Sequence, residues 1–96
     1  MDIIELILKI EINRRLYVGD DDITALEHFL GGYCFCCQLH GIDYNEKRLN
    51  DFMIFIYNEY DEKRSISIFQ CIKENSNTIE EEYDNFFNLV HKYLNN

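Results

Sequence analysis

The 96-residue chain contains no proline and only four glycines. No stretch rich in these residues therefore marks a linker, and no repeat or low-complexity block divides the sequence. A chain of this length is large enough to bury one hydrophobic core and too small for two. We therefore expect a single domain that spans residues 1–96.

Long apolar runs are also missing. A membrane-spanning helix needs about 18 or more consecutive apolar residues, and the sequence has no such run. The first residues, Met1 to Glu5, carry acids where a secretory signal carries lysines, and no small-residue cleavage site follows. The sequence thus predicts a cytoplasmic protein that does not contact a membrane.

Basic residues are scarce, with 9 Lys and Arg against 18 Asp and Glu and a formal net charge of −9. Binding to nucleic acid depends on Lys and Arg that displace counterions from phosphates, so this balance argues against it. A basic protein is the natural partner of an acidic surface. Solubility alone is an equally good explanation of the charge.

The chain is 47% hydrophobic and 15% aromatic, which excludes a disordered protein. Apolar residues recur at steps of three and four in several segments, as in amphipathic helices. The segment 65–74 also alternates like a strand, but no second strand pattern exists to pair with it, and we choose a helix. The expected helices are residues 2–13, 23–40, 46–60, 65–74 and a last one that begins at Thr78.

The most densely patterned part runs from Arg14 to Tyr33. Residues 14–19 are expected to form a loop that ends at Gly19, and Asp22 is the preferred N-cap of the helix that follows. Gly31 and Gly32 each cost about 1 kcal/mol relative to Ala within a helix, which predicts that another element crosses closely there. The face expected to be buried carries Ile23, Leu26, Phe29 or Leu30, Tyr33 and Cys37.

The last helix begins with a capping box, in which the Thr78 hydroxyl and the Glu81 carboxylate each satisfy a free backbone N–H. Its expected buried stripe consists of Ile79, Tyr83, Phe86 or Phe87, Val90 and Leu94, and its solvent side of Glu80, Glu82, Asp84, Asn88 and Lys92. Together these patterns predict an all-α domain of four to five short helices around an aromatic-rich core.

The residues that commonly carry chemistry form no convincing constellation. Of the four cysteines, Cys34, Cys36 and Cys37 share one helix, where neighbouring residues face different directions and the usual zinc spacing is absent. Reduced, packed thiols are the better interpretation, also for Cys71. A thiol nucleophile assisted by His28 is disfavoured because the acidic surroundings oppose thiolate formation. We predict no metal, no cofactor and no enzymatic activity.

Acidic residues gather at three helix boundaries. Capping explains one or two acids at each boundary, and the surplus indicates contact with a basic partner. Tyrosines that we expect to be exposed near the Glu59 cluster, such as Tyr44, Tyr57 or Tyr60, are suitable anchors. The candidate contact residues are Glu59, Asp61, Glu62, Glu80, Glu81, Glu82 and Asp84, followed by Asp20, Asp21 and Asp22.

The run Arg15-Leu16-Tyr17-Val18-Gly19, followed by Ile23-x-x-Leu26-x-x-Phe29-Leu30-x-Gly32-Tyr33, resembles a group of small bacterial immunity proteins. These proteins accompany secreted polymorphic toxins, including those of contact-dependent growth inhibition. The sequence departs from their pattern in three places: it lacks a proline after the arginine, has Leu16 for methionine, and has Asp22 for serine. The matched positions are mainly apolar, Gly or Tyr, and define a fold rather than a binding surface.

The resemblance implies a helical, non-enzymatic protein that binds and neutralises a toxin, often a nuclease. Combined with the acid clusters, it suggests an acidic surface that covers the basic active-site cleft of the toxin. The alternative is an acidic helical adaptor or regulatory subunit that binds a basic protein and involves no toxin.

Overall fold

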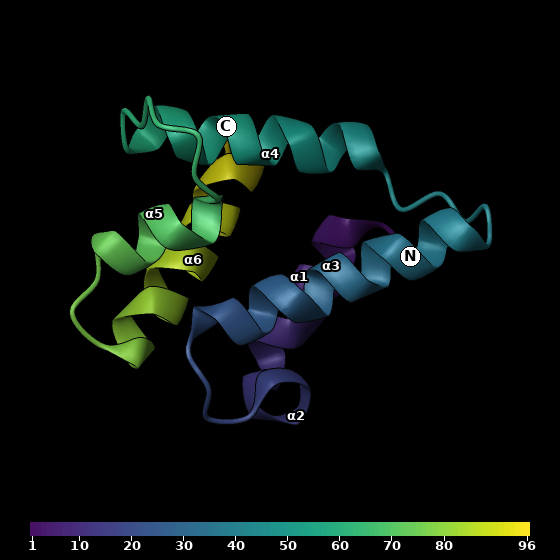
Figure 1. Cartoon of the computed structure of the whole chain (residues 1–96), viewed down its shortest axis with the longest axis horizontal. Coiled ribbons are helices and arrows are strands. Elements are labelled where there is room, and N and C mark those ends of the chain that lie inside the picture. The colour runs from purple at the N-terminus through teal and green to yellow at the C-terminus, as the bar shows by residue number, and fades with distance from the viewer.

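The computed structural model describes residues 1–96 as six helices without a strand (Figure 1), which confirms the all-α expectation. The helices are α1 (Ile3–Ile12), α2 (Arg14–Val18), α3 (Ile23–Leu39), α4 (Glu46–Glu59), α5 (Ile68–Glu74) and α6 (Ile79–Leu94). None of them combines the length and apolar character that crossing a bilayer requires.

The segment expected to be a loop is the short helix α2, so that expectation is wrong. Asn13 leaves helical geometry, with φ −144° and ψ 63°, and separates α1 from α2 without a longer connection. Gly19 then ends α2 with φ 62°, and its N–H donates to the Arg15 carbonyl at 3.0 Å. The glycine has the role that the sequence predicts, but the turn before it is helical.

The predicted N-caps are confirmed. Asp22 accepts a hydrogen bond from the Thr24 amide at 3.0 Å, and Thr78 accepts one from the Glu81 amide at 3.1 Å. Only this half of the capping box forms, because the Glu81 carboxylate makes no bond back to Thr78. Ser67 caps α5 in the same way, with the Gln70 amide at 3.1 Å, and this settles the ambiguous segment as helix.

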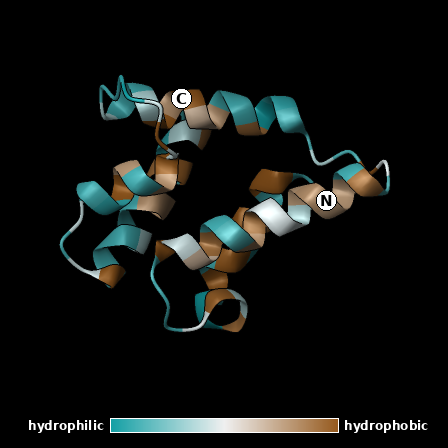
Figure 2. Ribbon diagram, in the orientation of Figure 1, coloured by the Kyte–Doolittle hydropathy of each residue, from teal (hydrophilic) through white to brown (hydrophobic).

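The core is one cluster of 19 buried residues to which all six helices contribute. Its centre is aromatic, as expected: Phe86 contacts Phe52 at a ring-centroid distance of 6.0 Å and Phe87 at 5.3 Å. Figure 2 shows hydrophilic and hydrophobic residues alternating along the helices, as expected for helices with one buried face. The sequence predicts Ile79 in the buried stripe of α6, but it is 41% exposed, so this prediction is wrong.

The close crossing expected at Gly31 and Gly32 does not exist. A Cβ atom added at either glycine would meet no heavy atom within 4 Å. α3 packs against α2, α5 and α6, and α4 packs against α1, α5 and α6, but α3 and α4 have no comparable contact with each other. The glycines therefore face open space rather than a neighbouring backbone.

Candidate partner-binding surface

The first turns of α3 and α6 lie side by side, which brings two acid clusters together that are about 60 residues apart in the sequence. The Tyr83 hydroxyl donates to the Asp21 carbonyl at 3.0 Å and to the Asp22 carbonyl at 2.8 Å. We call this region the α3/α6 acidic end. It consists of Asp20, Asp21, Asp22, Glu80, Glu81, Glu82 and Asp84.

Glu82 is not on the solvent side of α6, which corrects the sequence prediction. It is only 8% exposed, and its carboxylate accepts a hydrogen bond from the Ile23 amide at 3.1 Å. It thus satisfies one of the free N–H groups at the start of α3, where a negative charge also interacts favourably with the helix dipole. Glu82 joins two helices and is not available to a partner.

Arg14 occupies the space beside this junction. Its guanidinium lies 4.1 Å from the centre of the Tyr83 ring and donates to the Glu80 carboxylate at 2.7 Å, while its side chain is only 14% exposed. One of its nitrogens, Nη1, is buried without a hydrogen-bond partner. The charge of Glu80 is therefore largely balanced within the molecule.

The aspartates before α3 differ from one another. Asp22 pairs with Lys73 at 3.2 Å, and hydrogen bonds from Thr24 hold the pKa of Asp22 below its ordinary value. Asp20 approaches Arg15 at 3.4 Å, with both side chains more than two-thirds exposed, so water weakens this pair. Asp21 is exposed and has no basic partner.

Asp21 and Asp22 line a shallow recess of about 340 Å³ together with Thr24, Ala25 and His28. On α6, Glu81 and Asp84 also lack a basic partner; Asp84 is exposed and Glu81 partly so. Three uncompensated carboxylates, those of Asp21, Glu81 and Asp84, therefore remain at the α3/α6 acidic end. They are the charges that a basic partner can pair with.

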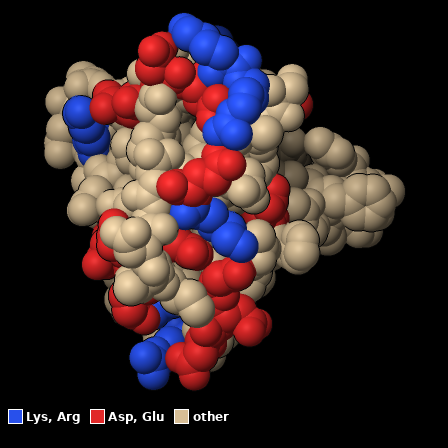
Figure 3. All heavy atoms as spheres, turned by 60° about the vertical axis from the view of Figure 1, so that its left-hand side comes forward, with Lys and Arg blue, Asp and Glu red and all other residues tan.

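The acids around the α4–α5 turn are in a different state. Glu59 pairs with Lys92 at 2.7 Å, Asp61 with Lys63 at 3.0 Å, and Glu62 with Arg64 at 2.7 Å. We call Glu59, Asp61 and Glu62 the paired turn. Figure 3 shows acids on this side of the molecule interrupted by lysines and arginines.

Glu62 is the most tightly held carboxylate of the paired turn. Its side chain is 11% exposed and accepts bonds from the Arg64 side chain and, at 3.0 Å, from the Arg64 amide. These hydrogen bonds lower the pKa of Glu62 to about 2. Arg64 also bonds to Glu74, so two acids share one arginine.

The tyrosines proposed as anchors are only partly accessible. Tyr44 is buried, with 6% of its surface exposed, and its hydroxyl accepts from Gln38 at 3.0 Å, so its expected exposure is wrong. Tyr57 is partly buried and donates to the Ile66 carbonyl at 2.6 Å. Tyr60 is also partly buried, and lines a recess of about 210 Å³ with Glu59 and Lys92.

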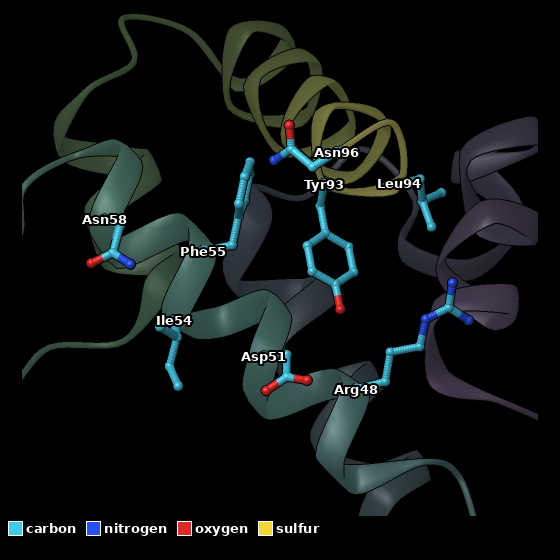
Figure 4. A pocket seen from close by; sticks show the side chains of 8 residues that line it. All are labelled: Arg48, Asp51, Ile54, Phe55, Asn58, Tyr93, Leu94 and Asn96. Carbon is cyan, nitrogen blue, oxygen red and sulfur yellow. The ribbon is translucent and has the colours of Figure 1, made fainter.

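The largest recess contains none of the candidate contact residues. It has a volume of about 510 Å³ and lies between α4 and the end of α6 (Figure 4). Tyr93 extends from α6 and packs on Phe52 and Phe55 at centroid distances of 5.3 and 5.6 Å. Ile54, an apolar residue of α4 in the lining of this recess, is 57% exposed.

The cysteines and histidines do not converge on one site. All four cysteines are free, and no three His, Cys, Asp or Glu residues lie close enough to hold a metal ion. Burial raises the pKa of Cys71 to about 11, so its thiol is uncharged at neutral pH. His28 is exposed in the recess beside Asp21, whereas Cys37 is buried in the core.

Comparison with known proteins adds no relative to this description. No family model, curated protein or solved structure matches the chain.

Proposed function

We propose that this chain is an immunity protein, which binds and neutralises a cognate bacterial toxin domain in the cytoplasm. The observation that carries the proposal is the α3/α6 acidic end, where Asp21, Glu81 and Asp84 present carboxylates without an internal base. The sequence pattern from Arg15 to Tyr33 supports the same class of protein. A toxin that acts on RNA or DNA needs a basic cleft, and an acidic surface is complementary to it.

The α3/α6 acidic end is the better binding surface for a physical reason. A partner that contacts the paired turn must compete with Lys92, Lys63 and Arg64, which already hold the acids there. At the α3/α6 acidic end, a partner can form ion pairs with Asp21, Glu81 and Asp84 without breaking any existing ion pair. The bonds of Glu82 and Tyr83 also fix the two helices relative to each other, so the backbone that carries the three carboxylates is positioned before binding.

The first step of the test is to identify the partner. The chain serves as bait in a lysate of its source bacterium, and each captured protein is expressed alone and together with the chain. An immunity function requires that one captured protein arrests growth and that the chain restores it. Capture of a harmless basic protein would instead support an adaptor or regulatory subunit.

The second step locates the surface with two matched triple variants. Asp21→Asn/Glu81→Gln/Asp84→Asn removes three unpaired charges from the α3/α6 acidic end. Glu5→Gln/Asp43→Asn/Glu46→Gln removes three charges that are also exposed and not ion-paired, but lie elsewhere. We expect the first variant to weaken toxin binding about tenfold and the second less than about twofold. Equal losses in the two variants would show that net charge alone matters and would overturn the assignment of the surface.

A further inference from the structure

A second feature, independent of the proposed function, is an apolar cavity of about 280 Å³ between α3 and α4. Five of the six helices contribute to its wall, and ten of its twelve lining residues are hydrophobic. Its floor is the core itself, since Ile7, Phe52 and Phe86 are almost completely buried. It exists because α3 and α4 each pack on other helices and not extensively on one another.

The cavity opens to the surface beside Gly31. This residue lines the cavity, is exposed, and has no heavy atom within 4 Å of the position of a Cβ. We expect a larger side chain at this position to narrow the opening.

The charge at the cavity is a single carboxylate. Glu27 is the only charged residue in the lining, is partly exposed, and takes part in no ion pair or hydrogen bond. The two other polar groups are already satisfied or neutral: the Tyr44 hydroxyl accepts from Gln38, and burial raises the pKa of the Cys34 thiol. A carboxylate at the edge of an apolar cavity favours a ligand with a positive charge next to an apolar tail.

From this arrangement we infer that the cavity binds a small organic cation with an apolar tail, such as a primary alkylamine. The tail lies among Phe52, Met53 and Phe86, and the ammonium group pairs with Glu27 at the opening. The size is suitable, because an apolar cavity of about 150 Å³ engineered in another protein binds benzene. The present cavity has room for a longer chain and is close to the lower limit of typical ligand pockets.

Two probes of equal length and opposite charge test the inference, octylamine and octanoate, both below the concentration at which they form micelles. Binding is measured by calorimetry and located by amide NMR shifts. We expect octylamine to bind, with shifts at residues of α3 and α4 that line the cavity, and octanoate to bind at least about fivefold more weakly.

Matched variants separate the cavity from general effects. Gly31→Leu fills the opening and is expected to weaken octylamine binding at least about tenfold, whereas Gly32→Leu, on the adjacent exposed residue outside the lining, leaves it unchanged. Both variants replace glycine by a good helix former, and their folding is checked by circular dichroism. Glu27→Gln is expected to reduce the preference for the amine to less than about twofold, and Glu5→Gln, which removes one exposed charge elsewhere, to preserve it.

Three results would overturn the inference. The first is that neither probe binds; if Gly31→Leu then weakens binding of a protein partner, the cavity receives a partner side chain instead. The second is equal affinity for amine and carboxylate in the unaltered protein. The third is an equal effect of Gly31→Leu and Gly32→Leu. The toxin-binding surface is tested separately, because Glu27, Gly31 and Gly32 lie outside the α3/α6 acidic end.

Discussion

The α3/α6 acidic end and the paired turn look alike in the sequence, as runs of acids at helix boundaries, but they differ in the folded protein. At the paired turn, three bases hold Glu59, Asp61 and Glu62. At the α3/α6 acidic end, one acid is buried as a helix cap and three have no basic partner. The local density of acids therefore does not determine the local electrostatic field; the positions of the few bases do.

The comparison also separates stability from charge. Glu82 contributes to stability because its carboxylate satisfies the Ile23 amide, and its burial removes it from the surface. Asp21, Glu81 and Asp84 contribute charge to the surface and make few contacts within the fold. Substitutions can therefore affect one property without the other.

The largest effect is expected for Glu82→Ala. The variant leaves the Ile23 amide without its acceptor and removes a negative charge from the start of α3, which should lower the free energy of unfolding by about 1–3 kcal/mol. Urea denaturation followed by circular dichroism measures the change. Glu82→Gln keeps a carbonyl acceptor and should lose less.

Glu81→Ala is the control, because it lies one residue away on the same turn and has no partner for its carboxylate. Its unfolding free energy should change by less than about 0.5 kcal/mol. If Glu81→Ala and Glu82→Ala cost the same, the cost comes from the helix dipole or propensity, and the difference between buried and exposed acids is lost.

Much of the fold follows from the sequence because its signals are local. The caps Asp22, Ser67 and Thr78 each act within three residues, and the stripes of α3 and α6 depend only on helical periodicity. The wrong expectations concern the arrangement of helices in space, which the periodicity of apolar residues does not predict. A single residue, Asn13, separates α1 from the short helix α2. Gly31 lines a cavity that depends on how α3 and α4 are placed.

The candidate site is less predictable for the same reason. Glu82 meets the Ile23 amide across 59 residues, and Arg14 meets Glu80 across 66. The sequence shows that the acids exist, but their partners become visible only once the helices are packed. The prediction that ranked the paired turn above Asp20, Asp21 and Asp22 counted acids and not bases. Lys63 and Arg64 directly follow Asp61 and Glu62 in the sequence, whereas Lys92 reaches Glu59 across 33 residues.

An intermediate effect is expected for Glu62 as the pH falls. Hydrogen bonds from Arg64 lower its pKa from an ordinary value of 4.5 to about 2, so the folded state binds the proton more weakly than the unfolded chain. The stabilisation is therefore fully present above pH 4.5 and is lost as the pH falls from 4.5 to 2. Glu62→Gln should remove this contribution to the pH dependence, measured as urea midpoints across the same range.

Glu74 and Asp22 also have lowered pKa values, so the unaltered protein alone does not isolate Glu62. The informative quantity is the difference between the two proteins, which should be largest near neutral pH and vanish toward pH 2. A difference that stays constant over the whole range would mean that Glu62 acts through packing rather than through its charge.

The smallest effect is expected for the ion pair between Glu59 and Lys92. The nitrogen and oxygen are 2.7 Å apart, but the Lys92 side chain is 58% exposed, and solvent screens such pairs. A double-mutant cycle with Glu59→Gln and Lys92→Met should give a coupling energy below about 0.5 kcal/mol. A coupling above about 1 kcal/mol would place this pair with Glu82 as a structural contact. The expected small value would mean that Lys92 cancels the charge of Glu59 while adding little to stability. Glu82, at the α3/α6 acidic end, instead contributes to stability through its hydrogen bond to the Ile23 amide.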